Sequence, residues 1–418
     1  MARTGIEGAH ARDPGSERPP AILLGGGSAL AVARSLGRDG MPVIVLAHKS
    51  DSVRWSRHCR FVETTGPDSQ ESWLEWLGQG PREGVLLPCN DDALELIVNH
   101  RATLEGLGYV AFEADDEVAR AMLDKARTYE LARDIGIPVP RTVTLEGDAD
   151  LASAAAEIGF PCALKPRHSH RFAHHFGMSK KVLLAEDAQQ FALGYARLAE
   201  LGVAVLATEI VPGRDDASFC SYYSYLDERG EPLFHMTKRK LRQSPAHFGL
   251  GCYHVTDWNP EVAELGLRFL QGVGLRGLAF VEFKRDARDG RLKLIECNHR
   301  FLSIMDLPIA AGFDLPLFTY NRIVGRPTPP LDSYRRGVHY WWAPADFRAF
   351  LGYRRSGELS FAGWVGSLLH RQRFQVASLR DPLPAIGVVA HKLKRRALAR
   401  LRPGAADKAR DQTHGPSR

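Results

Sequence analysis

The sequence predicts a chain of the α/β and α+β classes, in which a doubly wound unit precedes a larger mixed region. Residues 20–47 read as a strand, a glycine turn, a helix and a second strand, which is how doubly wound units begin. Residues 281–300 alternate apolar and polar side chains on both sides of an Asp-Gly turn, as in an antiparallel hairpin. Beyond residues 326–330, RPTPP, the composition shifts to Arg and Trp at helical spacing, which indicates a helical C-terminal extension.

Length and composition limit the class of protein. A chain of 418 residues is long enough for two or three domains with cores of their own. An apolar fraction of 44% and a charged fraction of 25% are typical of a soluble globular protein. No apolar run approaches the roughly 18 residues that span a bilayer. Residues 1–20 are polar and lack the apolar core of a signal peptide, so we expect a disordered tail, no transmembrane segment and a cytoplasmic location.

Cysteines and charges narrow the expected ligands and partners. The six cysteines are dispersed without a Cys-x-x-Cys pair, which favours buried free thiols and argues against a zinc site. Part of the net charge of +6 lies in HKLKRRALARLR, His391 to Arg402. A solvated terminal helix is the simpler interpretation of this segment, and contact with a membrane surface or a nucleic acid is the alternative. Because it lacks aromatic residues for base stacking, we expect no nucleic-acid partner.

Residues 21–115 are expected to form the doubly wound unit. Its strands are expected at 22–24, 43–46 and 85–87, with a helix over 29–36 and another that is capped at Asn90 or Asp91. The glycine turn suggests a dinucleotide site. Such a site expects an acidic residue after the second strand, where this chain has Ala47-His48-Lys49. The alternative is that the glycines serve tight packing or contact one end of a substrate.

The following region alternates helices and strands. Residues 115–136 read as one helix that is closed by Gly136 and followed by the extended segment IPVPRT. A strand carries Lys165 within FPCALKP, where apolar neighbours make an unpaired ammonium costly. Residues 217–258 read as a mixed sheet and residues 261–273 as a helix.

The hairpin near residue 290 places acids together. With Gly290 in the left-handed position of a three-residue loop, Ala287 faces Arg291 and Glu282 lies opposite Glu296. A two-residue loop would instead pair Phe283 with Glu296. In the first register Asn298 points to the same face as both glutamates. Like charges across a strand pair repel unless a cation lies between them, and this oxygen set suits Mg²⁺. The alternative is an exposed hairpin whose glutamates pair with nearby Lys and Arg.

The order of these pieces resembles the ATP-grasp superfamily over roughly residues 20–325. The resemblance is carried by Lys125 on a helix, Lys165 on a strand, the acidic hinge at Glu209, and the hairpin acids with Asn298. It is closest to the carboxylate–amine ligase branch that includes D-aspartate ligases. The domains that it implies are a Rossmann-like pre-ATP-grasp domain over 21–115, an ATP-grasp domain over 116–328, and an accessory C-terminal extension with a basic tail over 329–418.

The resemblance implies a nucleotide site. Lys125 and Lys165 are expected on the ATP phosphates, and the backbone near Glu209 and Val211 on the adenine edge. Asp216, seven residues beyond the hinge glutamate, is expected on the ribose, with Asp215 as an equal candidate.

The resemblance also implies a metal site and a phosphoryl contact. Glu282, Glu296 and Asn298 are expected to hold Mg²⁺ or Mn²⁺, and Arg300 is expected to steady the transferred phosphoryl group. His299 stands where the family commonly has a small residue, which leaves the orientation of Arg300 open.

Two basic segments are further candidates. In TKRKLRQ, residues 237–243, Lys238 and Lys240 share a strand face and are candidates for the γ-phosphate or an acidic substrate. A solvated edge strand is the alternative. In RHSHRFAHHFGMSKK a polar lid is expected, from which Lys180 or Lys181 reaches the phosphates; its four histidines leave a metal site as the alternative.

The function that this implies is an ATP- and Mg²⁺-dependent carboxylate–amine ligase. Such an enzyme forms an amide through an acyl phosphate and releases ADP and phosphate, with a small carboxylic acid and an amine as substrates. The alternatives are an NAD(P)-binding oxidoreductase and a non-catalytic nucleotide-binding regulatory module. The sequence leaves the identity of both substrates open, and a homodimer is one assembly compatible with it.

Overall fold

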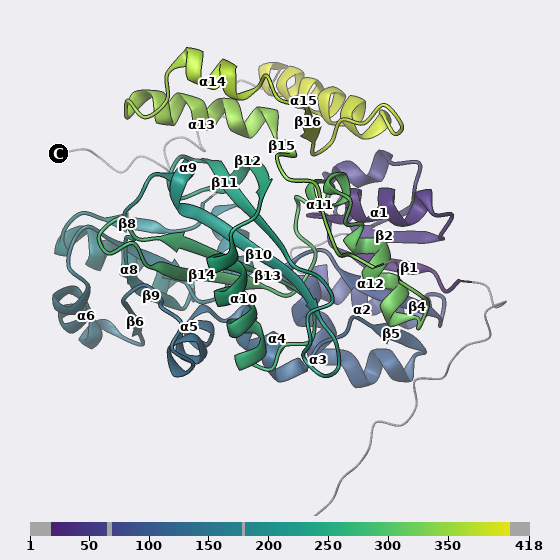
Figure 1. Ribbon diagram of the computed structural model, residues 1–418, viewed down its shortest axis with the longest axis horizontal. Helices are drawn as coiled ribbons and strands as arrows, with labels where there is room; N and C mark the ends of the chain where they lie inside the picture. Colours follow the sequence, from purple (N-terminus) through teal and green to yellow (C-terminus); the bar gives the residue numbers. More distant parts are fainter. Residues whose placement is uncertain (1–17, 65–68, 178–179, 329, 402–418) are drawn as a thin grey trace, which may run out of the picture.

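The computed structural model describes residues 18–64, 69–177, 180–328 and 330–401, which form three sheets with helices packed around them (Figure 1). Most of the predicted N-terminal tail and the end of the basic tail lie outside these residues. The predicted mixed fold class is confirmed, because one sheet is parallel and the other two are largely antiparallel.

The first sheet is parallel, with strand order β3-β2-β1-β4-β5. Its strands are β1 (Ala21–Leu24), β2 (Val43–Ala47), β3 (Arg60–Glu63), β4 (Gly84–Pro88) and β5 (Tyr109–Ala111), and its helices are α1 (Ala29–Arg38), α2 (Ser69–Gln79) and α3 (Asp91–Gly106), with a short 3-10 turn η1 (Ser52–Trp55). The three central strands are buried along their whole length, as parallel strands covered on both faces must be. The α3 cap is Asn90, whose side chain accepts from the Ala93 N–H.

The glycines of the first turn serve close packing. A Cβ on Gly25 would lie 2.6 Å from the Asn90 side chain, and Gly25 has a φ of +87°. A Cβ on Gly26 would lie 2.0 Å from the Asp51 carboxyl carbon. The backbone therefore approaches two polar side chains more closely than any other residue would allow, which supports the packing interpretation of the turn.

The second sheet has four strands in the order β6-β9-β7-β8. The elements of this part are α4 (Asp116–Leu123), α5 (Lys125–Asp134), β6 (Thr142–Leu145), η2 (Asp148–Asp150), α6 (Leu151–Ile158), β7 (Cys162–Pro166), α7 (Ser169–Phe176), β8 (Leu183–Ala185), α8 (Ala188–Glu200) and β9 (Val205–Glu209). The single helix predicted over 115–136 is wrong. It is broken at Asp124, whose extended backbone and side-chain bond to the Ala126 N–H cap a second helix, so Lys125 lies at a helix start.

The third sheet has seven strands in the order β14-β13-β10-β11-β12-β15-β16 (Figure 1). Its strands are β10 (Phe219–Leu226), β11 (Met236–Ser244), β12 (Leu250–Asp257), β13 (Gly277–Arg285), β14 (Leu292–Asn298), β15 (His339–Trp341) and β16 (Gln372–Phe374), and the helices of this part are α9 (Asp215–Ser218), α10 (Pro260–Gly272), α11 (Asp306–Ala311), α12 (Leu315–Ile323), α13 (Ala343–Arg355), α14 (Phe361–Ser367) and α15 (Leu383–Leu401). The C-terminal extension thus supplies two strands to this sheet.

Two buried aspartates fasten the C-terminal extension to the rest of the chain. Asp346 accepts from Arg242 on β11 at 2.6 and 3.0 Å and from the indole nitrogens of Trp341 and Trp364. Asp381 accepts from Arg34 on α1 at 2.9 Å, and from the Ser56 hydroxyl and the Arg57 N–H, which directly follow η1. Because both carboxylates are almost fully inaccessible, these ion pairs hold the extension in one place.

The six cysteines are free, five of them buried, as predicted. Within residues 18–401, excluding the three short gaps, no helix combines the length and apolar character that crossing a bilayer requires.

Replacing Asp346 by Ala leaves the Arg242 guanidinium buried without its partner. We expect the free energy of unfolding to fall by about 3–5 kcal/mol, visible as an earlier thermal transition in calorimetry. Glu261→Ala is the control, since it breaks an ion pair with Arg285 that is half exposed and should cost less than about 1 kcal/mol. Equal transitions in the two variants would contradict a fastening role for Asp346.

Candidate functional site

The hairpin of β13 and β14 holds two glutamates directly opposite each other. Glu282 pairs with Glu296 in the strand register, as predicted, and Asn298 follows on the same face. The predicted loop is wrong: the Asp286 N–H donates to the Arg291 carbonyl at 2.9 Å, so four residues, 287–290, form the turn. A bulge next to Glu282 restores the predicted pairing further along the strands. Gly290 has a φ of +73°, the left-handed conformation that was predicted.

Both glutamates are surrounded by ammonium groups. Lys240 Nζ donates to Glu282 Oε1 at 2.8 Å. Burial alone would raise the pKa of Glu296, but nearby lysine charges, foremost Lys181, Lys125 and Lys165, lower it to about 2. Glu296 is therefore ionised at neutral pH. The alternative of a simple exposed hairpin is wrong, because these carboxylates face a buried cluster of cations.

Lys125 and Lys165 come from different elements and lie close to Glu296. Lys125, the first residue of α5, donates to Ser169 Oγ at 2.5 Å, and Lys165 on β7 donates to the Tyr129 hydroxyl at 2.6 Å. Burial lowers the pKa of each lysine to about 8, and the negative charge of Glu296 opposes that shift. Asp91, Lys125, Ser169, Glu296 and Asn298 are among the side chains that line one small cavity of about 20 Å³.

Arg300 reaches from the end of β14 to the first sheet. Its Nε donates to Asp91 Oδ1 at 2.5 Å, and this pairing holds the pKa of the Asp91 carboxyl well below its usual range although burial opposes the shift. Sequence reasoning considered Asp91 only as a helix cap and missed this contact. The preceding His299 is buried, and its Nδ1 lies 2.8 Å from the Leu278 carbonyl, so the imidazole occupies the core and leaves Arg300 to point at the site.

Lys238 and Lys240 lie on a central strand. β11 pairs with β10 on one side and β12 on the other, and both lysines are buried, so the alternative of a solvated edge strand is wrong. Lys238 Nζ lies 3.2 Å from His254 Nδ1, and burial lowers the pKa of Lys238 to about 8. Lys240, which bonds Glu282, is the nearer of the two to the hairpin acids.

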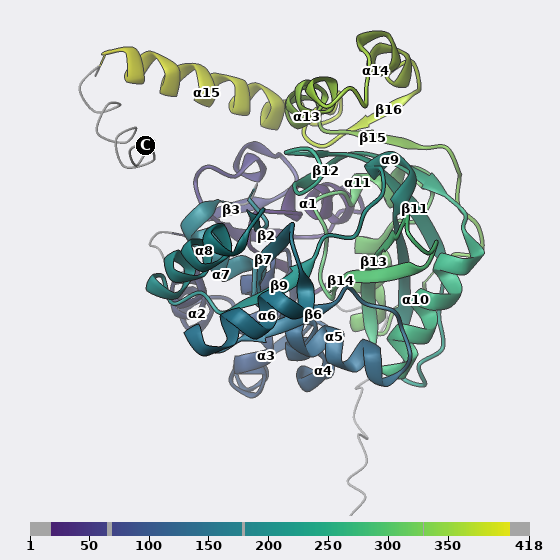
Figure 2. The same ribbon diagram turned by 90° about the vertical axis from the view of Figure 1, so that its left-hand side faces the viewer.

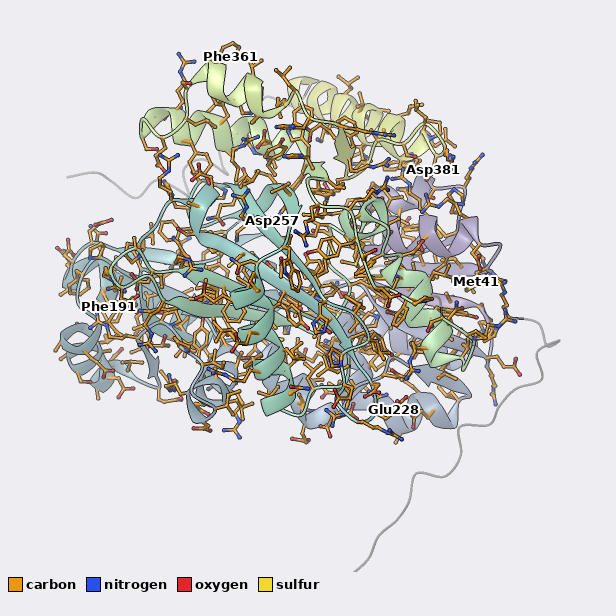
Figure 3. The ribbon with its side chains drawn as sticks, viewed as in Figure 1. Met41, Phe191, Glu228, Asp257, Phe361 and Asp381 are labelled. Atoms are coloured by element: carbon orange, nitrogen blue, oxygen red, sulfur yellow. The ribbon has the colours of Figure 1, made fainter. Side chains whose placement is uncertain are left out.

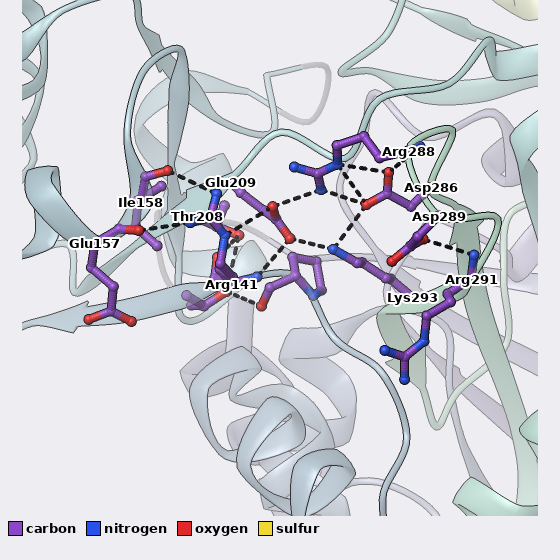
Figure 4. A network of polar contacts seen from close by, with 12 residues as sticks. Arg141, Glu157, Ile158, Thr208, Glu209, Asp286, Arg288, Asp289, Arg291 and Lys293 are labelled. Atoms are coloured by element: carbon purple, nitrogen blue, oxygen red, sulfur yellow. Dashed lines mark hydrogen bonds and ion pairs between the residues drawn. The ribbon is translucent and has the colours of Figure 1, made fainter.

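Glu209, which was predicted to lie at the hinge, is the centre of a second charge network (Figure 4). Glu209, the last residue of β9, accepts from Lys293 at 2.6 Å, from Arg288 at 2.8 Å and from the Arg141 N–H at 3.0 Å. Burial would raise its pKa, but these donors lower it to about 2. Lys293 and Arg288 also contact Asp286, so the network ties the end of β9 to the hairpin turn. Sequence reasoning placed Glu209 at a hinge but missed this network.

The two candidates for the ribose contact differ in accessibility. Asp215 is buried, and its Oδ2 accepts from Gln243 at 2.9 Å, from the His247 N–H at 3.0 Å and from the Tyr353 hydroxyl of the C-terminal extension. Asp216 is half exposed and pairs with Arg214 at 2.9 Å. Of the two carboxylates, Asp216 is the one that a ligand can reach. Val211, the other residue predicted at the hinge, is buried two positions beyond Glu209.

The histidine-rich segment forms α7 and packs against α3. His170 Nε2 lies 3.3 Å from Glu95, and His174 Nε2 lies 3.2 Å from Asp92. Among the residues that the structure describes, no group of three or more His, Cys, Asp or Glu side chains is arranged to hold a metal ion. Of the two lysines that follow, Lys181 acts electrostatically on Glu296, whereas Lys180 lies 5.3 Å from the Phe176 ring. Both line a cavity of about 670 Å³.

Two proteins of known activity are similar to this chain in sequence. No family model matches the chain. The chain is 25% identical over 366 residues to a D-aspartate ligase of Enterococcus faecium, which covers 81% of this chain and 85% of that protein. It is 29% identical over 187 residues to a D-alanine–D-alanine ligase of Ectopseudomonas mendocina, but this covers only 42% of this chain and 55% of that protein.

A solved structure shows the same fold. The biotin carboxylase domain of Hydrogenobacter thermophilus 2-oxoglutarate carboxylase, in complex with MgADP, ADP and bicarbonate, matches with a TM-score of 0.59. The match covers 76% of this chain and 73% of that chain at 17% identity. At this identity the likeness concerns the fold alone.

Replacing Glu296 by Gln removes an anion that raises the pKa of both Lys125 and Lys165. Both values, about 8 in the parent, should therefore fall, so that each lysine loses its proton at a lower pH. Titration of the Cε signals in lysine-labelled protein by NMR measures this shift. Glu261→Gln, an exposed acid on α10, is the control that should leave both titrations unchanged. Identical titrations in the parent and Glu296→Gln would show that Glu296 does not neutralise these lysines.

Proposed function

The chain belongs to the ATP-grasp superfamily, and we propose that it is an ATP-dependent carboxylate–amine ligase. The observation that carries this proposal is the meeting of Glu282, Glu296 and Asn298 with lysines from three other elements, α5, β7 and β11. Phosphate groups and a divalent cation are the ligands that balance such a mixture of opposite charges.

The hairpin side chains fit a hard divalent cation. Glu296 is ionised with a pKa of about 2, and Glu282 is held as an ion-pair partner of Lys240. Asn298 Nδ2 donates to Glu296 at 3.2 Å, which leaves its amide oxygen as a further ligand. Two carboxylates and an amide oxygen are the donor set for Mg²⁺ or Mn²⁺. These three residues would hold the metal, which supplies neutralisation of phosphate charge when bound.

The remaining residues are assigned from their position and charge. Lys125, Lys165 and Lys181 bind the phosphate oxygens of ATP in this proposal, since all three act on Glu296. The backbone at Glu209 and Val211 meets the adenine edge, and Asp216 meets the ribose. The charge network around Glu209 supports the hinge role because it fixes the end of β9 against the hairpin.

Arg300 and Lys238 are assigned to the phosphoryl transfer itself. The Asp91 carboxylate and the Phe301 carbonyl accept from Arg300, and a guanidinium has five N–H donors, so others remain for the transferred group. Lys238 lies on β11, two residues before Lys240, and its Nζ contacts His254 Nδ1. Positioning and charge neutralisation are the main contributions that phosphoryl transfer needs from a protein.

The reaction that we propose has two steps. A carboxylate oxygen of the acid substrate attacks the γ-phosphorus of ATP, ADP leaves, and an acyl phosphate forms. The amine then attacks the acyl carbon, phosphate leaves with the oxygen that bridged carbon and phosphorus, and the nitrogen loses a proton to give the amide. The relatives are named as ligases of D-aspartate and of D-alanine, so we propose a small amino acid as one substrate. Their names support this reading over an oxidoreductase or a regulatory module.

Replacing Glu282 or Glu296 by Gln keeps the side-chain volume but removes a ligand charge. We expect magnesium-dependent ADP release, measured over a panel of amino acids and amines, to fall by about 10²-fold or more in each variant. The control is Asp289→Asn, an exposed acid in the turn of the same hairpin, whose activity should equal that of the parent. Parent-like turnover in both glutamine variants would overturn the proposed function.

A further inference from the structure

The C-terminal extension exposes most of the apolar side chains that the described part of the chain leaves in solvent. Eleven of the fifteen large exposed apolar side chains lie between residues 347 and 393. They are Phe347, Leu351, Phe361, Val365, Leu369, Phe374, Leu379, Leu383, Ile386, Val389 and Leu393. Figure 3 shows Phe361 at the outer edge of the layer formed by the extension. Concentrated exposed apolar surface of this kind marks an interaction site more often than chance exposure.

Helix α15 presents this surface in an ordered way. One face packs against η1, because Gly387 lies so close to Trp55 that a Cβ would lie 2.3 Å from the indole ring. The opposite face carries Ile386, Val389 and Leu393, each more than half exposed. We call these three residues the apolar stripe; their spacing of three and four residues places them along one side of the helix. Figure 2 shows α15 extending beyond α13 at the margin of the molecule.

The charge of the extension is strongly unbalanced. Between residues 343 and 402 there are twelve Lys and Arg against three acids, Asp346, Glu358 and Asp381, a formal charge of +9. Since the whole chain carries +6, the remainder carries −3. Asp346 and Asp381 form buried ion pairs with Arg242 and Arg34, so their charges do not offset the cations at the surface. Lys392 and Lys394, which flank Leu393, are exposed.

We propose that the apolar stripe of α15 and its flanking cations bind the surface of an anionic lipid bilayer. An apolar stripe bordered by Lys and Arg lies in the plane of the interface, with the apolar side chains in the acyl boundary and the cations at anionic headgroups.

The other occupants fit the surface less well. A second copy of this chain, related by a two-fold axis, would bring the same dense positive charges together without acids to meet them. A nucleic acid would satisfy the cations but leave the aliphatic stripe in water, because Ile, Val and Leu offer no ring for base stacking.

Sedimentation with sucrose-loaded vesicles tests the proposal on the full chain. We expect binding to phosphatidylcholine vesicles that contain phosphatidylglycerol and little binding to phosphatidylcholine alone. Each cation at an anionic surface changes partitioning about fivefold, so the double variant Lys392→Gln with Lys394→Gln should bind about 25-fold more weakly. Leu393→Ser should weaken binding about tenfold or more. Leu193→Ser is the matched control, because Leu193 on α8 is similarly exposed but lies outside the extension.

Thermal transitions equal to that of the parent show that the variants fold. Vesicle sedimentation does not depend on the proposed ligase activity, so the two proposals can fail separately. Failure to bind anionic vesicles, or equal weakening by Leu193→Ser and Leu393→Ser, would overturn the proposal. Self-association that Leu393→Ser abolishes, without vesicle binding, would assign the stripe to a second copy instead. Binding of a DNA or RNA fragment that the double lysine variant abolishes, again without vesicle binding, would also overturn it.

Discussion

The repulsion between Glu282 and Glu296 is the constraint around which the rest of the structure is arranged. Two ionised carboxylates directly across a strand pair are unfavourable unless positive charge lies close to them. Lys240 meets one of them directly, and lysines from α5, β7 and the segment before β8 act on the other. Since β7 belongs to the second sheet and β11 to the third, the pair of acids brings separate parts of the chain to one place.

Three further sets of charge contacts keep these parts in position. The network around Glu209 connects the end of β9 to the turn of the hairpin, and the Arg300–Asp91 pair connects the end of the hairpin to the first sheet. Asp346 holds the C-terminal extension to β11, the strand that carries Lys238 and Lys240. In each of them the carboxylate is largely buried, so removing its cationic partner leaves an uncompensated charge behind. The extension therefore contributes to the rigidity of the strand beneath the site.

Much of this arrangement was accessible from the sequence because it depends on local patterns. Short apolar runs around a glycine turn predicted the first sheet, and the alternation of apolar and polar residues predicted the opposition of Glu282 to Glu296. The loop was predicted wrongly, since sequence spacing cannot reveal the bulge beside Glu282 that restores the register. The break at Asp124 was missed because the residues on either side of it have ordinary helix propensity. The pairing of Arg300 with Asp91 joins residues far apart in the chain, which no local pattern can predict.

The central claim is that the hairpin acids bind a divalent cation together with the nucleotide. Anomalous diffraction from crystals grown with Mn²⁺ and a non-hydrolysable ATP analogue tests this claim most directly. The account predicts a manganese peak within coordination distance of carboxylate oxygens of both Glu282 and Glu296, in contact with the phosphates. A metal–nucleotide complex bound away from these two side chains, with the contact between Lys240 and Glu282 intact, would contradict it.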